Sequence, residues 1–273
     1  MSQSESKTVI QDWTETIPKE KKIGVVAPLY GYFQDLGDEQ LNWETLSAFL
    51  TKIKTASLKL FLVVPCEVAR LDKNVQNVLI GRSKAGGMEV LDLDKYSGYG
   101  DYIKDGIEYL LENTDCEYIV ITNPWIMLKD NSIDQMAQRL NTGDVDIISG
   151  VDLRKLVWGT YNGIPAEQFD TFNFNPPTEI ANKHFDFNFW GMTRQHAQVL
   201  ISRIDTDYKT IFFQQADIWG NAFNIQYNLI SSQFLPFYSF DIDFKTVDAK
   251  DEFEEDKQHF IDKWGFITET KYE

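Results

Sequence analysis

Short apolar runs that stop at a proline, each followed by a segment of helical period, constrain the fold of this chain most. The first run covers 23–27 and stops at Pro28, and the second covers 58–64 and stops at Pro65. Between them, 46–53 places apolar side chains on one face of a helix. Strands buried on both faces and joined by single helices form parallel sheets with right-handed crossovers. The sequence therefore predicts a single α/β domain with a mainly parallel sheet flanked by helices.

The same alternation continues along the chain. Further strands are expected at 88–93, 118–122, 145–151 and 234–244, and further helices at 103–111, 132–140, 194–204 and 215–228. Ser132 and Gln135 have the spacing of a capping box at the start of their helix. The stretch 152–192 is rich in aromatic residues, Asn and Pro, and is expected to be irregular and to line a pocket.

We expect a flexible arm at 1–22, followed by one domain over 23–273. Within that domain, 23–151 is expected to form one half and 152–273 the other. Ligands of parallel α/β sheets bind beyond the carboxyl ends of the strands, so the residues that follow each strand are the place to look. These segments are 28–32, 65–70 and 123–127.

Charge and composition exclude several classes of partner. The formal net charge is −16, and such a field repels nucleic acid and bare anionic membranes. No apolar run approaches the roughly 20 residues that span a bilayer, and the first residues lack the apolar core of a signal peptide. Two cysteines are too few for a disulfide framework. A cytoplasmic location is the resulting expectation.

Four segments follow one another in a recognisable order. They are GYG through DGI at 98–107, YIVITNPWIML at 118–128, QQADIWGNA at 214–222 and HFIDKWG at 259–265. Together they resemble the inverting family 2 glycosyltransferases, which share the GT-A (Rossmann-like) fold. The resemblance covers about residues 22–265, and no single motif in it is specific.

The resemblance implies transfer of a sugar from a nucleotide-sugar to an acceptor hydroxyl with inversion. Such a reaction needs a general base, and the matching segment offers Asp217. The halves 23–151 and 152–273 would then hold the nucleotide-sugar and the acceptor. The implied donor-binding residues are Pro28, Tyr30, Glu67, Gly98, Lys104, Asn123 and Trp125, and the implied acceptor-binding residues are Trp190, Gly191 and Trp219.

The departures from the family pattern fall at the residues that would bind the metal and carry out the reaction. The metal-binding Asp-x-Asp is replaced by 123–125, which reads Asn-Pro-Trp, and the Glu-Asp pair before the acceptor helix is Gln214-Gln215. Asp241 and Asp243 have the spacing of a relocated metal site, although exposed acids in an acidic chain are the simpler interpretation. Whether Mn²⁺ or Mg²⁺ takes part stays open.

Each candidate also has a purely structural interpretation. Asp217 would interact with the dipole of its helix, and Trp125 and Trp264 would pack in the core. The alternative function is accordingly a non-catalytic relative that binds a carbohydrate or a nucleotide.

Overall fold

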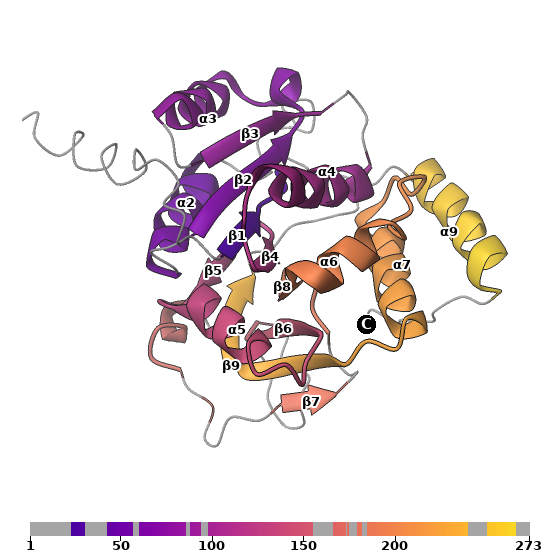
Figure 1. Cartoon of the computed structure of the whole chain (residues 1–273). Helices are drawn as coiled ribbons and strands as arrows, with labels where there is room; N and C mark the ends of the chain where they lie inside the picture. Colours follow the sequence, from indigo (N-terminus) through magenta and orange to yellow (C-terminus); the bar gives the residue numbers. More distant parts are fainter. Residues whose placement is uncertain are drawn as a thin grey trace, which may run out of the picture.

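The computed structural model describes ten segments of the chain. They are 23–30, 43–56, 60–85, 88–93, 98–154, 166–172, 174, 179–181, 185–239 and 250–265. The predicted arm at 1–22, Asp241 and Asp243 lie outside them. The described residues build one α/β unit around a single nine-stranded sheet (Figure 1).

The strands are β1 (Ile23–Val26), β2 (Leu60–Cys66), β3 (Met88–Asp92), β4 (Tyr118–Thr122), β5 (Ile126–Leu128), β6 (Ile147–Asp152), β7 (Glu179–Ala181), β8 (Phe189–Thr193) and β9 (Leu229–Ser239). The α-helices are α2 (Trp43–Ala56), α3 (Lys73–Ala85), α4 (Tyr99–Asn113), α5 (Ser132–Leu140), α6 (Arg194–Ile201), α7 (Ile211–Asn224) and α9 (Lys250–Trp264). Two short 3₁₀ turns cover Val68–Arg70 and Ala166–Gln168.

The sheet has the order β3-β2-β1-β4-β8-β6-β9-β5, and β7 also pairs with β9. Strand β1 lies between β2 and β4 and is parallel to both, which confirms the predicted neighbourhood of the three apolar runs. Strand β8 is antiparallel to both β4 and β6, and β5 and β7 are antiparallel to β9. The other six strands share one direction, so the predicted mainly parallel α/β fold is confirmed.

Helices cover both faces of the sheet. A Cβ at Gly24 would lie 2.7 Å from a methyl carbon of Leu110 in α4, and one at Gly191 would lie 2.7 Å from Sδ of Met136 in α5. Gly191 is in register with Val25 across β4, and side chains of adjacent residues in a strand point to opposite faces. Helices α4 and α5 therefore lie on opposite faces, and both glycines permit close packing.

The segment 152–192 differs from its prediction. It contains β7 and the start of β8 rather than only irregular structure. Strand β8 is buried on both faces between β4 and β6, so its sequence FWGMT shows no alternation of polar and apolar residues. Strand β9 begins at Leu229, earlier than predicted. Its first half was missed because the polar run 231–233 interrupts the apolar pattern.

The capping box predicted at Ser132 and Gln135 is wrong. Asn131 is the N-cap residue, with a left-handed φ of 60° and no side-chain cap bond. Its backbone N–H donates instead to the carbonyl of Thr55. The Ser132 hydroxyl is buried and has no hydrogen-bond partner among the described residues.

One core cluster takes residues from both predicted halves, from Ile23 in β1 to Phe237 in β9. Among the described residues, no helix has the length and apolar character that crossing a membrane requires.

Candidate functional site

The chain leaves β1 and runs on beside β2. The backbone N–H groups of Ala27 and Leu29 donate to Val63 and Pro65 at 2.8 and 2.9 Å, so Pro28 is held in the interior. The Tyr30 hydroxyl donates to the carbonyl of Lys209 at 2.7 Å. The ring of Tyr30 meets those of two α4 residues edge to face, with centroids 5.6 Å from Tyr99 and 5.3 Å from Tyr102.

At the end of β4, four polar side chains are linked by hydrogen bonds. The Tyr99 hydroxyl donates to Oδ1 of Asn123 at 2.9 Å, and Nδ2 of Asn123 donates to Oδ1 of Asn188 at 2.7 Å. Nε1 of Trp125 donates to the same Asn188 oxygen at 3.1 Å. All four side chains are buried. Trp125 acts here as an indole donor, with no oxygen to offer a cation.

Sequence reasoning did not single out Asn188 or its neighbour Asp186. The Asp186 carboxylate is half-buried, accepts the backbone N–H of Asn188 at 2.8 Å, and contributes to the raised pKa of Tyr99, whose main cause is burial. Both residues precede β8, and only the pairing of β8 with β4 brings them to Asn123. The segment HFDFNFWG, in which polar residues alternate with aromatic ones, was the available signal.

At the end of β2, the buried carboxylate of Glu67 accepts two hydrogen bonds. Tyr102 donates to it at 3.1 Å, and Nη1 of Arg70 lies 3.2 Å away. Burial raises the pKa of Tyr102, and the charge of Glu67 raises it further. The Tyr102 hydroxyl is therefore a donor to Glu67 at neutral pH.

Asp217 lies in the contact between α7 and α9. One of its oxygens is 2.8 Å from Nζ of Lys263 and accepts Nε1 of Trp264 at 2.9 Å, and the other accepts Nδ2 of Asn221 at 3.0 Å. The residue is 0% exposed, and burial raises its pKa although Lys263 opposes the shift. Asp217 therefore holds the two helices together in this conformation. It lies in the middle of α7, so the predicted interaction with the helix dipole is wrong. Trp264 is half-buried against a small aromatic cluster that includes Phe260, rather than in the main core.

The four segments of the resemblance meet one another. Gly98 lies against the backbone carbonyl of Tyr208, just before α7, and a Cβ at Gly100 would lie 2.2 Å from Oε1 of Gln214 in α7. A Cβ at Gly220 would lie 2.9 Å from the ring of Trp264 in α9. Tyr99, as described above, bonds to the end of β4.

Most donor candidates therefore gather at one edge of the sheet, whereas the acceptor candidates do not. Lys104 is half-buried further along α4. Trp190 and Gly191 lie inside the sheet, where the Trp190 side chain is 1% exposed and closed to a ligand. Trp219 is half-buried on α7 with its ring stacked on Phe223 at 5.4 Å.

Among the described residues, one group has the spacing of metal ligands. Oxygens of Asp205 and Asp207 and a ring nitrogen of His259 lie within 4.8 Å of one another. Nζ of Lys263 is 2.8 Å from Asp205, however, so a positive charge already occupies this group. We assign no metal to it.

Comparison with known proteins identifies the fold but no family. No family model and no curated protein matches the chain. Among solved structures 595 chains match, so the fold is widely shared and does not by itself select a function. One match is the crystal structure of residues 1–349 of TarS from S. aureus, a glycosyltransferase.

The likeness to TarS has a TM-score of 0.54 at 11% sequence identity. It covers 88% of this chain and 64% of the TarS chain, so this chain spans less than two thirds of that structure. What the fold and topology show is a Rossmann-type α/β fold similar to that of TarS.

Proposed function

We propose that this protein is an inverting glycosyltransferase of the GT-A type, which moves a sugar from a nucleotide-sugar to an acceptor hydroxyl. One observation carries the proposal. Residues chosen from the strand ends and the resemblance together, among them Tyr30, Glu67, Asn123 and Trp125, are linked by ring contacts and hydrogen bonds into one buried cluster at the carboxyl ends of β1, β2 and β4. That edge is where α/β sheets bind nucleotides.

The proposed donor site works without a carboxylate-held metal. Trp125 has no lone pair for a hard cation, and Asn123 offers a neutral amide that is already bonded on both sides. The aromatic rings of the cluster offer stacking surfaces for a base or a sugar once the nucleotide separates them. Lys104 supplies positive charge toward the diphosphate in this proposal.

The proposed base is Asp217, and its use requires a movement. Both of its oxygens are bonded within the protein, so Lys263 and Trp264 have to withdraw before an acceptor hydroxyl reaches the carboxylate. Lys263 keeps a second partner in Asp205, which lowers the cost of that withdrawal.

A second candidate function is the non-catalytic relative that binds a carbohydrate or a nucleotide. Two observations favour the non-catalytic relative. The polar groups at the strand ends are hydrogen-bonded to one another, and the Asp217 side chain is fully buried. The fold would then serve binding, with no base available.

Thermal unfolding with UDP, GDP, dTDP and their sugars tests the proposal. A ligand at 100 times its Kd stabilises the native state by about 2.7 kcal/mol, and we expect one nucleotide class to do so equally with Mn²⁺ and with EDTA. Trp125→Ala should abolish the shift, and Ile80→Ala, at an exposed apolar position on α3, should leave it unchanged. Mn²⁺-dependent affinity that disappears in Asn123→Ala would contradict the metal-free site.

Binding without transfer to any acceptor would leave the non-catalytic relative. If no nucleotide or nucleotide-sugar changes the melting temperature, the proposed function is wrong.

A further inference from the structure

A groove of about 640 Å³ lies away from the strand-end cluster, between α5, β7 and the outer side of β9. Strand β9 pairs with β7 near Ser232 and with β5 from Phe237 onward. The residues between these two pairings, 233–236, contribute to the groove wall. None of the donor or acceptor candidates lines it. Its lining is Lys129, Asp130, Ser132, Gln135, Gln138, Arg139, Thr142, Phe174, Glu179, Ser232, Gln233, Phe234, Leu235 and Pro236.

The groove combines an open aromatic ring with an apolar wall. Phe234 is 54% exposed, and its neighbours in the wall are Leu235, Pro236 and the half-buried ring of Phe174. Burying a ring of this size is a large part of what a ligand gains in such a groove. The flat apolar face of a pyranose ring is complementary to an exposed aromatic ring.

Neutral hydrogen-bonding groups line the groove from α5. Gln135 and Gln138 are exposed, and each amide supplies both donors and an acceptor. Ser132, at the start of the helix, also lines the groove, but its side chain is 1% exposed and its hydroxyl is closed to a ligand. The two amides are therefore the neutral groups of α5 that a ligand reaches.

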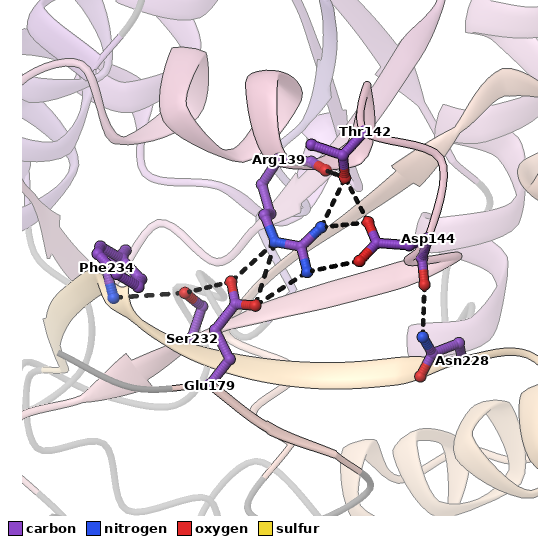
Figure 2. A network of polar contacts seen from close by, with 7 residues as sticks. All are labelled: Arg139, Thr142, Asp144, Glu179, Asn228, Ser232 and Phe234. Carbon is purple, nitrogen blue, oxygen red and sulfur yellow. Dashed lines mark hydrogen bonds and ion pairs between the residues drawn. The ribbon is translucent and has the colours of Figure 1, made fainter.

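The groove is lined by equal numbers of cationic and acidic side chains. Lys129 and Arg139 are opposed by Asp130 and Glu179. Arg139 binds both oxygens of Glu179, with contacts of 2.9 Å from Nε and Nη2, and also binds Asp144, which keeps its guanidinium fixed (Figure 2).

The other cation, Lys129, and the carboxylate of Glu179 make further contacts. Nζ of Lys129 donates to the carbonyl of Phe172, and burial lowers its pKa. Glu179 accepts the hydroxyl of Ser232 at 3.2 Å, which in turn accepts the backbone N–H of Phe234 (Figure 2). The network thus fixes the backbone of β9 at Phe234 and with it the position of the aromatic ring. Because its cations are engaged and the chain has a net charge of −16, the groove has little attraction for an anion.

We propose that this groove binds a neutral carbohydrate chain. A sugar ring lies on Phe234, and neighbouring hydroxyls bond to Gln135 and Gln138. The site is additional to the strand-end cluster and acts in binding alone, so it holds for a transferase and for a non-catalytic relative alike.

Isothermal titration of the full chain with maltohexaose, cellohexaose and chitohexaose tests the groove. We expect one of the three to bind, Phe234→Ala to weaken that binding about tenfold, and Phe234→Tyr to retain it. Gln138→Ala, an exposed helix position, should weaken binding severalfold without loss of stability. An anionic oligogalacturonate should not bind, and equal affinity for it would overturn the neutral specificity.

Phe223→Ala is the matched control. Phe223 is also 54% exposed, but it lies on α7 beside Trp219. Its removal should leave saccharide binding unchanged, and a loss there with Phe234→Ala unaffected would move the sugar to the Trp219 surface and refute the groove. The proposal also fails if no saccharide binds, including the case in which Phe234→Ala instead changes the sedimentation of the protein.

Failure of the groove and failure of the proposed function can be told apart. Nucleotide-induced melting shifts should be unchanged in Phe234→Ala, and saccharide binding should be unchanged in Asn123→Ala.

Discussion

The side chains at the strand ends were partly predictable one residue at a time. Asn123 and Trp125 follow an apolar run, so the sequence locates them at the edge of the sheet. Asn188 and Asp186 could not be located in this way, because their position depends on the pairing of β8 with β4. The burial of Asp217 could not be predicted either, since the partners that cover it, Lys263 and Trp264, lie in α9.

Asp217→Asn should lower the free energy of unfolding by about 2 kcal/mol, because a charge-assisted contact with Lys263 is lost while Lys263 keeps Asp205. If the protein transfers sugars, the same change should reduce turnover by a factor on the order of 10² to 10⁴ and leave donor affinity unchanged. Denaturant unfolding and initial rates measure the two effects. The exposed Asp207→Asn is the control, and an unchanged rate in Asp217→Asn removes Asp217 from the mechanism.

Cys66 should be inert in the native protein. Burial raises the pKa of its thiol from 9.0 to about 12, and the charges of Asp92 and Glu67 add to the shift. At neutral pH a thiol reagent should label it only after unfolding. Rapid labelling of the native chain would show that the end of β2 opens.

The same shift has a consequence for stability at high pH. Above pH 9.0 the thiol of the unfolded chain ionises while the folded one stays protonated up to about 12. The contribution is therefore complete below 9.0 and lost as the pH rises, with a slope of about 1.4 kcal/mol per pH unit. Unfolding curves of the wild type and Cys66→Ala should converge over this range, and parallel curves would argue against the raised pKa.

At the scale of elements, apolar continuity was the reliable signal. Strands β1, β2 and β4 are continuous apolar runs and lie close to their predicted positions. The predicted stop at Pro65 is wrong, because β2 runs through this proline and pairs with β3 as far as Cys66. Helix α7 begins at Ile211 instead of 215, because Asp256 in α9 binds the N–H and hydroxyl of Thr210 just before it. That contact, like the pairing of β8, is tertiary and leaves no local pattern.

Two glycines in helices should respond in opposite ways to alanine. A Cβ at Gly220 would meet the Trp264 ring, so Gly220→Ala should destabilise the protein by about 1–3 kcal/mol and loosen α9. A Cβ at Gly81 in α3 meets nothing within 4 Å, so Gly81→Ala should stabilise by about 0.5–1 kcal/mol. Chemical denaturation measures both changes, and equal effects would contradict the α7–α9 packing.

At the scale of the whole molecule, the single sheet and its core cluster join both predicted halves. We expect one cooperative unfolding transition, with calorimetric and van't Hoff enthalpies in agreement. Two resolved transitions would show that the halves fold as separate units.

The place of β8 in the sheet also affects how the protein is made. Strand β4 ends at Thr122, but its neighbour β8 begins at Phe189, so about 67 residues are translated before the edge of β4 is covered. At roughly 5–20 residues per second this takes about 3–13 s. During that time a nascent chain that has assembled β3, β2, β1 and β4 presents an apolar strand with unpaired backbone groups. Newly synthesised protein is therefore most prone to aggregate before β8 leaves the ribosome.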